Sequence, residues 1–459
     1  MSTSPTLPTA AAETPLSPRF RLITIGSIVL VFVAAFENLA VTTVMPVISA
    51  ELGGEALYAV AFAAPLAASV LGMVIAGNWC DSRGPRTPLA VSVAFFLAGL
   101  IVAGSSFSME QIVIGRLVQG LGSGGTTVAL YVIVARVYPP SLRPKVFGLF
   151  SAAWVVPALV GPLIAGVLGQ TVGWRWVFLG VAALIVPATV MVAPAMRHLA
   201  STGTDAASRV PWSVRRILWA LLLALAILTL SVSAEFPGAL ALVVAAVAFV
   251  VAIVALRPLM PAGTLRAVRG LPSTLLTKIA LAGGYFSAEV YLPYLLTSEH
   301  GLSPAAAGLA LTASGVFWGA ASLVQGRLGE RLTSRTSVRI GIAGVVLAIA
   351  IVLLATALDL PAWVSIAGWA ISGTGMGFAY PRLSVLVLGQ SRPEQQGFNS
   401  AALNIADAGG PAVSLAIAGI LFQGIGHGAA TAGAFTAVFV LSAVLAVASG
   451  LIGGRLPKG

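Results

Sequence analysis

The sequence predicts an all-α protein that crosses a membrane fourteen times, and three observations predict it: the composition, the lengths of the apolar stretches and the distribution of charge. Hydrophobic residues make up 58% of the 459 residues and charged residues 8%, whereas roughly 25% of the residues in a soluble domain are charged. The mean hydropathy is +1.00. So few charges cannot cover a surface in water. The composition therefore argues against a soluble enzyme, a nucleic-acid-binding protein, a disordered protein and a disulfide-linked scaffold.

Fourteen apolar stretches are long enough to cross the hydrocarbon core of a bilayer as helices, which takes about 20 residues. Several contain glycine or proline, and membrane helices tolerate both. Open strand edges are not stable in lipid, so each stretch is predicted to be a helix. In chain order the stretches are 22–47, 58–76, 88–106, 110–138, 146–169, 175–196, 216–234, 239–257, 272–297, 304–326, 338–357, 363–389, 397–422 and 431–453.

The charges predict the orientation of these spans. With the N-terminus inside, lysine and arginine gather on the cytoplasmic connections, while acids such as Glu51 and Glu235 fall on outer loops. Arg175 is the only base near an outer loop. This is the positive-inside distribution, and it fails if one span is dropped. We therefore expect both termini in the cytoplasm. The abundance of Ala, Gly and Arg indicates a bacterial protein and hence the cytoplasmic (inner) membrane.

Two segments of the chain align without a gap at a constant offset of 249 residues, which indicates an internal repeat. The matched positions are Gly77 with Gly326, Asp81 with Glu330, Arg86 with Arg335, Tyr131 with Tyr380, and Gly161-Pro162 with Gly410-Pro411. Duplicated halves are typical of transporters, whose substrate site lies between the halves near the middle of the bilayer.

The repeat predicts two six-helix halves with a two-helix insert between them. The first 21 residues are expected to be a polar cytoplasmic tail rather than a signal peptide. The expected segments are the N-terminal tail (1–21), the N-terminal six-helix half (22–196), a linker with two extra spans (197–271), the C-terminal six-helix half (272–453) and a cytoplasmic tail (454–459).

Four motifs are similar to those of the major facilitator superfamily, and specifically of its 14-span drug/proton antiporter branch. The motifs are Gly77-Asn-Trp-Cys-Asp81-Ser-Arg83-Gly84-Pro-Arg86 after the second span, Arg116-Leu-Val-Gln119-Gly120-Leu-Gly122, Pro157-Ala-Leu-Val-Gly161-Pro162-Leu-Ile-Ala165-Gly166 and Trp174-Arg175-Trp176-Val-Phe178. The third resembles an exporter motif in which glycines stand where this chain has Pro157 and Ala165. The resemblance covers the chain from about residue 20 and implies the major-facilitator fold.

The first motif is expected to be a gating loop. The resemblance implies that Asp81 meets the N-terminus of the helix that begins near residue 397 when the inner side closes, where free N–H groups and the helix dipole favour a carboxylate. Gly77 and Gly84 permit close approach and a tight turn. Arg86 completes the motif, and Glu330 and Arg335 repeat it more weakly in the second half. The alternative is a basic loop that only sets topology.

Three acids and one base lie inside predicted spans, where a bare charge is costly. Glu37, Glu289 and Asp407 are therefore expected to face a cavity, to form a pair or to carry a proton. We expect Glu37 and Glu289 to take part in proton coupling or substrate binding. Asp407 is either a third such group or the partner of Arg382, at similar depth. Arg116 lies within reach of Glu37 or else extends to the outer headgroups.

Two further features bear on the substrate. Gly161-Pro162, with Pro157 and Gly166 nearby, is expected to bend its span, because proline removes a backbone hydrogen bond; the alternative is that Gly and Pro are simply common in membrane helices. Aromatic residues near the expected site could hold lipophilic cations, although packing against lipid is the stronger expectation for most. They are Phe36, Tyr131, Trp154, Tyr285, Tyr291, Tyr294 and Trp318.

No cofactor or metal ion is expected. The chain has one cysteine, Cys80, and its three histidines, His198, His300 and His427, are scattered. The glycine-rich run from Gly120 to Gly125 lies inside an apolar span with no preceding strand, so it is not a nucleotide-binding loop. The energy for transport must then come from an ion gradient or from the substrate itself.

These features together predict a monomeric, alternating-access exporter of lipophilic or cationic compounds that is driven by protons. Multidrug or antibiotic efflux, and thus antibiotic resistance, is the expected role, with small molecules, protons and membrane lipids as partners and no nucleic acid. The alternatives are a dedicated carrier for one metabolite or antibiotic, a lipid flippase, and a receptor or scaffold that transports nothing. Buried acids argue against a scaffold, which has no need of them.

Overall fold

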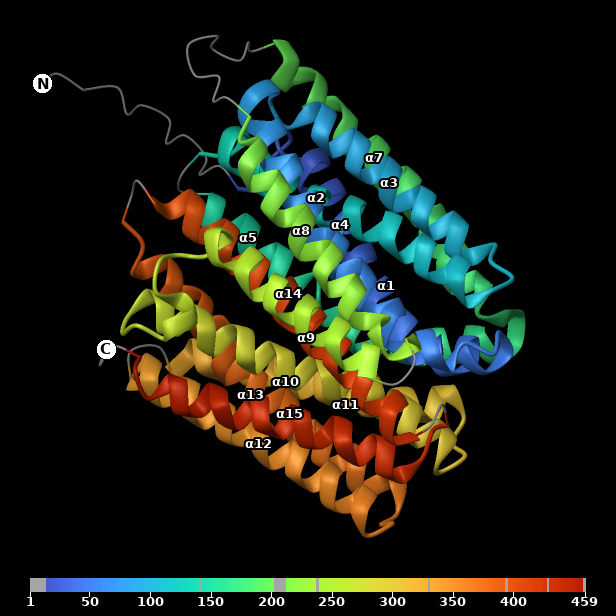
Figure 1. Cartoon of the computed structure of the whole chain (residues 1–459). Coiled ribbons are helices and arrows are strands. Elements are labelled where there is room, and N and C mark those ends of the chain that lie inside the picture. The colour runs from blue at the N-terminus through green and yellow to red at the C-terminus, as the bar shows by residue number, and fades with distance from the viewer. Residues whose placement is uncertain are drawn as a thin grey trace, which may run out of the picture.

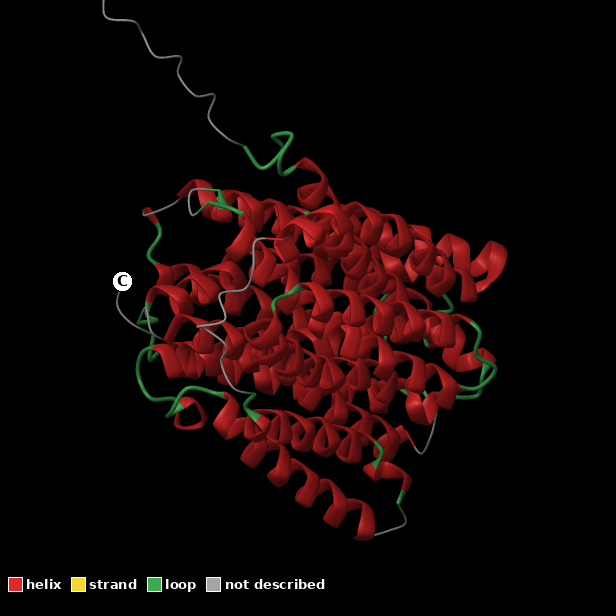
Figure 2. Cartoon of the chain, turned by 90° about the horizontal axis from the view of Figure 1, so that it is seen from above, coloured by secondary structure: helices red, strands yellow, loops and turns green. Residues whose placement is uncertain are grey.

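The computed structural model describes residues 14–139, 142–201, 212–236, 239–328, 331–392, 395–426 and 429–456. All regular structure in these ranges is helical (Figure 2). The helices, labelled in Figure 1, are α1 (Arg21–Glu51), η1 (Glu55–Leu57), α2 (Tyr58–Arg83), α3 (Arg86–Gly104), α4 (Met109–Val137), α5 (Arg143–Ala152), α6 (Val155–Leu168), η2 (Gly169–Gly173), α7 (Arg175–Ser201), α8 (Val214–Ser231), η4 (Ser233–Glu235), α9 (Ala239–Leu256), η5 (Arg257–Leu259), η6 (Thr264–Arg266), α10 (Leu271–Ser298), α11 (Pro304–Leu328), α12 (Ser334–Ala357), α13 (Ala362–Gly389), α14 (Gln396–Gly426) and α15 (Ala432–Gly453).

Helices occupy all fourteen predicted stretches, in the predicted order, and the fifth stretch holds two helices, α5 and α6. Among the described residues, twelve helical segments are long and apolar enough to cross a membrane. The remaining two, α10 and α13, have 28 residues each, which is about 42 Å at the helical rise. They are more polar because they carry Lys278, Glu289 and Arg382. Two of these charged residues, Lys278 and Glu289, are buried on α10.

The helices form two bundles joined side by side (Figure 1). α1–α7 make the first half and α10–α15 the second, and the halves meet where α6 packs on α11 and α2 packs on α14. The insert helix α8 packs on both α2 and α14, and α9 packs on α8. We call the end of the bundle where α1 begins and α15 ends the terminal end, at the left in Figure 1, and the opposite end the far end.

Glycines allow the helices within each half to approach closely. A Cβ atom at Gly124 of α4 would collide with the backbone of Ser69 on α2. At Gly373 of α13, the position 249 residues later, a Cβ atom would collide with the backbone of Ser314 on α11. In both cases the added Cβ atom would meet backbone atoms, and these cannot move aside by a change of rotamer. The two halves therefore use the same small-residue packing, which is common between membrane helices.

The predicted span at 146–169 corresponds to one candidate membrane span, Lys145–Gly173, but it is not one continuous helix. α5 ends at Ala152 and α6 begins at Val155. Pro157 explains the break, because it has no N–H for the carbonyl of Ala153 and its ring clashes with that carbonyl. The matching position in the second half is Ala406, and α14 runs unbroken there. The break thus arises at Pro157, and α6 continues through Pro162.

Candidate functional site

The guanidinium of Arg116 joins three helices of the first half. Its Nη1 donates to Glu37 on α1 and, at 3.0 Å, to Oε1 of Gln119 on α4. Its Nε donates to the carbonyl oxygen of Ala61 on α2 at 3.2 Å. The side chains of Arg116 and Glu37 are only 4% and 5% exposed. Arg116 therefore forms a buried ion pair and does not extend to the headgroups.

The contact with Ala61 depends on a proline one turn later. Pro65 lies inside α2 and has no N–H to donate to the carbonyl of Ala61. That carbonyl is therefore available to Arg116. Gly120 lies directly against the backbone of Pro65 and lets α4 come close at this level. The proline of one helix and the glycine of the next thus prepare the site for the guanidinium.

A second buried charge centre joins α10, α13 and α14 in the other half. Nζ of Lys278 lies 2.9 Å from Oδ1 and 3.1 Å from Oδ2 of Asp407, and it donates to Oγ of Ser384 at 2.9 Å. It also lies 4.3 Å from the ring centroid of Tyr380, whose hydroxyl donates to Oδ1 of Asp407 at 2.5 Å. The lysine side chain is 1% exposed, whereas that of Asp407 is 34% exposed. The accessible group of this pair is therefore the carboxylate.

The alternative that Asp407 pairs with Arg382 is wrong. The ion pair of Asp407 is with Lys278, while the guanidinium of Arg382 faces the side-chain amide of Gln325 on α11. Lys278 and Arg382 lie at similar depth in the predicted membrane. Which of them faces Asp407 depends on how α10 and α13 are rotated about their axes. Sequence spacing did not point to Lys278, because its repeat-related position in the first half is Val29.

The third in-span acid, Glu289, lies in a network of hydroxyl groups. Tyr285 donates to its Oε1 at 2.9 Å, and the same hydroxyl lies 2.9 Å from Oγ of Ser314. Ser314 lies 3.3 Å from Oγ of Ser372. Tyr285 also stacks on Trp369, with centroids 5.2 Å apart. This network links α10, α11 and α13.

Glu289 differs from the other two acids in having no counter-ion. The ion pairs among the described residues hold Glu37 and Asp407 but not Glu289, and Glu289 is only 8% exposed. A carboxylate buried without a cation is costly, so this group is stable when protonated or when a cation binds beside it. Among the described residues, no three His, Cys, Asp or Glu side chains lie close enough together to hold a metal ion.

The two halves are in close contact at the far end. Tyr58 on α2 donates to the carbonyl oxygen of Val290 at 2.9 Å, and Gln423 on α14 donates to that of Glu55 at 2.9 Å. The Tyr58 ring lies 5.4 Å from that of Tyr291 and 4.5 Å from that of Tyr294. All three tyrosines are buried. The expectation of lipid contact is therefore wrong for Tyr291 and Tyr294, which close the far end.

At the terminal end, Asp81 lies exposed on the last turn of α2. Within the described part of the chain, no hydrogen bond or ion pair joins it to α14. Arg136 and Arg216 are the cations whose charges act on it. Arg216, from α8, also lies 5.7 Å from the ring centroid of Phe398 on α14. The insert thus reaches both sides of the predicted gate.

The start of the insert docks on α2 beside Asp81. Nε1 of Trp212 donates to Oγ of Ser82 at 2.9 Å, and the backbone N–H of Ser213 donates to Oδ1 of Asn78 at 2.8 Å. The Trp212 ring lies 6.5 Å from that of Trp79. Trp212–Arg216, which we call the strap, had no assigned role in the sequence.

The other gating-loop residues have separate surroundings. Gly84 ends α2 at φ +80°, a conformation that favours glycine. Gly77 lies in loose contact with α4, and Arg86 is exposed at the start of α3. Arg335 donates to the carbonyl oxygen of Gly454 at 2.7 Å. Glu330 lies outside the described residues.

The exporter-like motif lies where the two halves touch. A Cβ atom at Gly166 of α6 would lie 2.5 Å from Cα of Ala305 on α11, and a Cβ atom at Gly308 would lie 3.2 Å from Cβ of Pro162. Gly161 faces the ring of Phe36 on α1. The motif thus lies at the α6–α11 contact between the halves.

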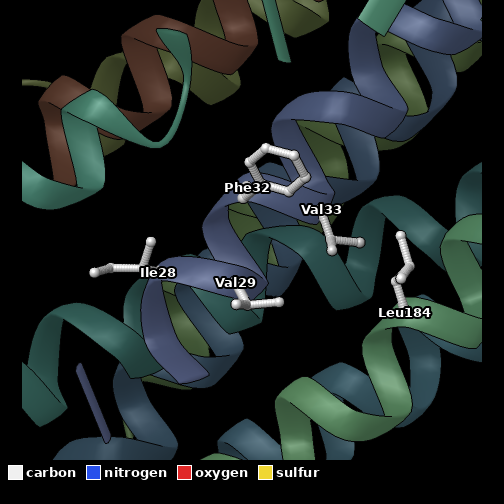
Figure 3. A pocket seen from close by; sticks show the side chains of 5 residues that line it. All are labelled: Ile28, Val29, Phe32, Val33 and Leu184. Carbon is white, nitrogen blue, oxygen red and sulfur yellow. The ribbon is translucent and has the colours of Figure 1, made fainter. Parts of the chain in front are cut away.

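One hollow lies along α1 and has no polar lining. Its lining residues are Ile28, Val29, Phe32, Val33 and Leu184, and they come from α1 and α7 (Figure 3). Val29 matches Lys278 in the repeat. The charge centre of the second half thus has an apolar counterpart in the first.

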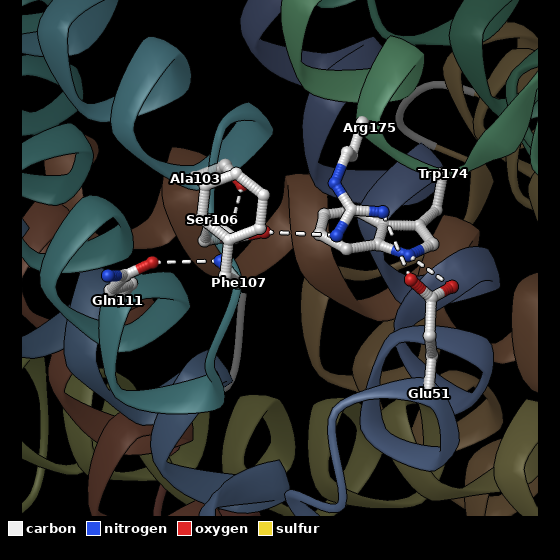
Figure 4. A network of polar contacts seen from close by, with 7 residues as sticks. All are labelled: Glu51, Ala103, Ser106, Phe107, Gln111, Trp174 and Arg175. Carbon is white, nitrogen blue, oxygen red and sulfur yellow. Dashed lines mark hydrogen bonds and ion pairs between the residues drawn. The ribbon is translucent and has the colours of Figure 1, made fainter.

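A polar network at the far end explains the lone outer base. Nη1 of Arg175 lies 3.0 Å from Oε1 of Glu51, and its Nη2 donates to the carbonyl oxygen of Ser106 at 3.1 Å (Figure 4). Trp174 donates to Oε2 of Glu51 at 2.8 Å. The network ties the end of α1 and the α3–α4 connection to the start of α7, so the first half is held together at this end.

Comparison with known proteins gives one family. The family model described as Major Facilitator Superfamily matches residues 27–287 and 274–457. Among solved structures, the chain is similar to a D-xylose-proton symporter, with 14% identity, a TM-score of 0.66 and coverage of 96% of this chain and 98% of that one. A partially occluded inward-open structure of the xylose transporter XylE from E. coli gives 13% identity, a TM-score of 0.63 and coverage of 95% and 97%. At these identities the likeness shows the fold alone.

Curated relatives match part of the chain. The "Multidrug resistance protein 3" of Bacillus subtilis is 30% identical over 158 residues, which is 34% of this chain and 31% of the relative. The "Efflux pump FUS6" of Gibberella moniliformis is 29% identical over 199 residues, 43% of this chain and 35% of the relative. An "Acurin A biosynthesis cluster MFS-type transporter" of Aspergillus aculeatus is 32% identical over 160 residues, which is 35% of this chain and 29% of the relative. The matches thus span about a third of the relatives' length.

Proposed function

The chain belongs to the Major Facilitator Superfamily, and we propose that it exports lipophilic or cationic compounds in exchange for protons. Membership makes it a multi-pass membrane transporter of small molecules and not an enzyme. The direction of transport, the coupling to protons and the substrate class belong to the proposal. A fungal relative named as an efflux pump and a bacterial relative named as a multidrug resistance protein support export.

The observation that carries the proposal is Glu289, a buried carboxylate with no ion-pair partner in the part of the chain that the structure describes. In the absence of a cation it is stable with a proton, and a cationic substrate beside it would stabilise the ionised form instead. Substrate and proton would then exclude each other at one group. Exchange of one for the other follows from electrostatics, with the O–H bond of the acid broken and the proton passed to water.

Glu37 is the second coupling group in this proposal. Its carboxylate already has Arg116 as a counter-ion, so protonation of Glu37 would leave the guanidinium held only by the neutral oxygens of Gln119 and Ala61. The loss of the ion pair would loosen the contact between α1, α2 and α4. A proton at Glu37 can therefore act on helix packing, while a proton at Glu289 acts on substrate binding.

The experiment is substrate-induced proton release from purified protein in weakly buffered detergent, followed by transport in proteoliposomes with and without a pH gradient. A panel of lipophilic cations and matched neutral compounds tests the substrate class. We expect proton release for the wild type and one proton fewer released per bound cation in Glu289→Gln. Glu37→Gln is expected to abolish uphill export while neutral compounds still bind. Glu110→Gln, at an exposed acid at the start of α4, is the matched control.

Wild-type proton release in both Glu37→Gln and Glu289→Gln would place the coupling elsewhere and overturn these assignments. Transport of one compound alone across the panel would favour a dedicated carrier. Movement of a fluorescent phospholipid between leaflets would favour a flippase.

The 14-span branch, the bacterial inner membrane and the cytoplasmic location of the terminal end are also part of the proposal. They rest on the charge distribution and on the insert helices α8 and α9, both of which are apolar enough to span. Single cysteines at Glu235 and Arg209 test them, because the proposal places these positions on opposite sides. Labelling of both from one side would refute the 14-span topology.

A further inference from the structure

The groups around the ammonium of Lys278 form a complete receptor for an ammonium ion. Two carboxylate oxygens of Asp407 lie at 2.9 and 3.1 Å, and the hydroxyl of Ser384 accepts at 2.9 Å. The face of the Tyr380 ring lies at 4.3 Å. An anion, a hydroxyl acceptor and an aromatic face together satisfy an ammonium by charge, hydrogen bond and cation–π contact. In this structure the chain's own lysine fills that receptor.

The receptor is sealed on the side of the lysine and open on the side of the acid. The side chain of Lys278 is 1% exposed and that of Asp407 is 34% exposed. The charge of Asp407 also acts on Tyr131, which lies on α4 in the other half and is 40% exposed. A molecule between the halves at this level can therefore reach the carboxylate without first reaching Lys278.

We propose that Lys278 is a tethered ligand that occupies an amine-binding subsite formed by Asp407, Tyr380 and Ser384, and that protonated amines compete with it for Asp407. The inference rests on the proposed function, because it assigns one class of substrate to this site. The favoured class is a protonated amine with an aromatic or alkyl body. Its N–H groups replace those of Lys278 on Asp407, and its body lies toward Tyr131.

Displacement of Lys278 requires a proton to leave. A second cation beside a single carboxylate would leave one buried ammonium without a counter-ion. The N–H bond of Lys278 therefore breaks, the electron pair stays on its nitrogen and the proton passes to water. One protonated amine enters and one proton leaves, so the charge of the site is unchanged. The proton released at this subsite comes from the lysine.

The test is binding of phenethylammonium to the purified full-length protein by calorimetry in detergent, with 2-phenylethanol as the neutral probe. Lys278→Gln removes the competing ammonium, so we expect phenethylammonium to bind at least tenfold more tightly than to the wild type. Lys278→Arg introduces a guanidinium that cannot lose its proton in this pH range, so we expect at least tenfold weaker binding and one proton fewer released per amine bound than in the wild type. Asp407→Asn is expected to weaken amine binding and to leave the binding of 2-phenylethanol unchanged.

Unchanged or weaker amine binding in Lys278→Gln would overturn the proposal, as would release of the wild-type number of protons per bound amine in Lys278→Arg. If the glutamine variant does not fold, Lys278→Met provides the same test, because it also removes the ammonium. Binding is measured without transport, so the two proposals fail separately. Tighter binding in Lys278→Gln with no uphill transport by the wild type would contradict proton-coupled export and leave the subsite in place. Uphill export by the wild type with unchanged amine binding in Lys278→Gln would contradict the subsite and leave proton-coupled export in place.

Discussion

At the scale of single residues, each buried charge is held by groups that the local backbone leaves available. Arg116 uses a carbonyl that Pro65 leaves without a donor, and Lys278 uses the hydroxyl and ring of neighbours on α13. A buried ion pair adds little net stability, but loss of one partner leaves an uncompensated charge. The pair of Arg116 and Glu37 is therefore sensitive to single substitutions and tolerant of paired ones.

Arg116→Met is expected to destabilise the protein by about 3–5 kcal/mol, because Glu37 is then left buried without a cation. The double variant Arg116→Met with Glu37→Gln should recover much of that loss. Thermal unfolding in detergent measures both, with Arg86→Met, at an exposed arginine, as the control. A double variant no more stable than the single one would show that the ion pair is not the cause.

Sequence reasoning placed Arg116 within reach of Glu37 because both lie at related depths in spans whose order is fixed. It did not place Lys278 beside Asp407, since depth alone also allowed Arg382, and it gave Tyr285 no role beside Glu289. Pairing between helices depends on the rotation of each helix about its axis, and that rotation is set by packing contacts distant in sequence. Such contacts leave no local signal.

At the scale of helices, the two halves differ in helix continuity at the repeat-related positions 157 and 406. Pro157 separates α5 from α6, while Ala406 leaves α14 continuous. The lengths and order of the helices followed from the apolar stretches alone. The break did not, because proline is tolerated inside other helices of this chain, including at Pro162 and Pro411. The surroundings of each proline decide whether a helix continues.

Pro157→Ala is expected to join α5 and α6, because residue 157 regains an N–H for the carbonyl of Ala153 and the clash is removed, a change of up to about 3 kcal/mol. Hydrogen exchange should show greater protection of the amides around Trp154. Pro162→Ala, within the intact α6, serves as the control. If protection at residues 153–158 is unchanged, a cause other than Pro157 separates the two helices.

At the scale of the whole molecule, contacts between the halves close the far end, whereas at the terminal end no hydrogen bond or ion pair among the described residues joins Asp81 to the second half. Tyr58 and Gln423 bridge α2, α10 and α14 at the far end. At the terminal end, Arg216 of the strap acts on Asp81 by its charge and lies over the ring of Phe398. We infer that direct contact of Asp81 with the N-terminus of α14 belongs to the opposite state of the transport cycle.

Asp81→Asn is therefore expected to favour the state described above, because the opposite state loses a charge–dipole contact worth up to about 2 kcal/mol. Tyr58→Phe should shift the balance the other way by about 1 kcal/mol, through loss of the hydrogen bond to Val290. Labelling of a cysteine introduced at Ala59, which is buried and faces Gly419 at the far end, reports the change. Slower labelling in Asp81→Asn and faster labelling in Tyr58→Phe are the expected results, and equal rates would contradict this account of the gate.

Cys80 gives the molecule a practical property. It is the only cysteine in the sequence, it is fully buried, and it immediately precedes Asp81. A fluorophore or spin label attached to an introduced surface thiol therefore carries an unambiguous signal, with no native residue to remove. The native thiol supplies a second signal of its own, because Cys80 is buried and its alkylation requires the packing around this end of α2 to open. The rate of Cys80 alkylation therefore reports gate movement in the protein without any substitution.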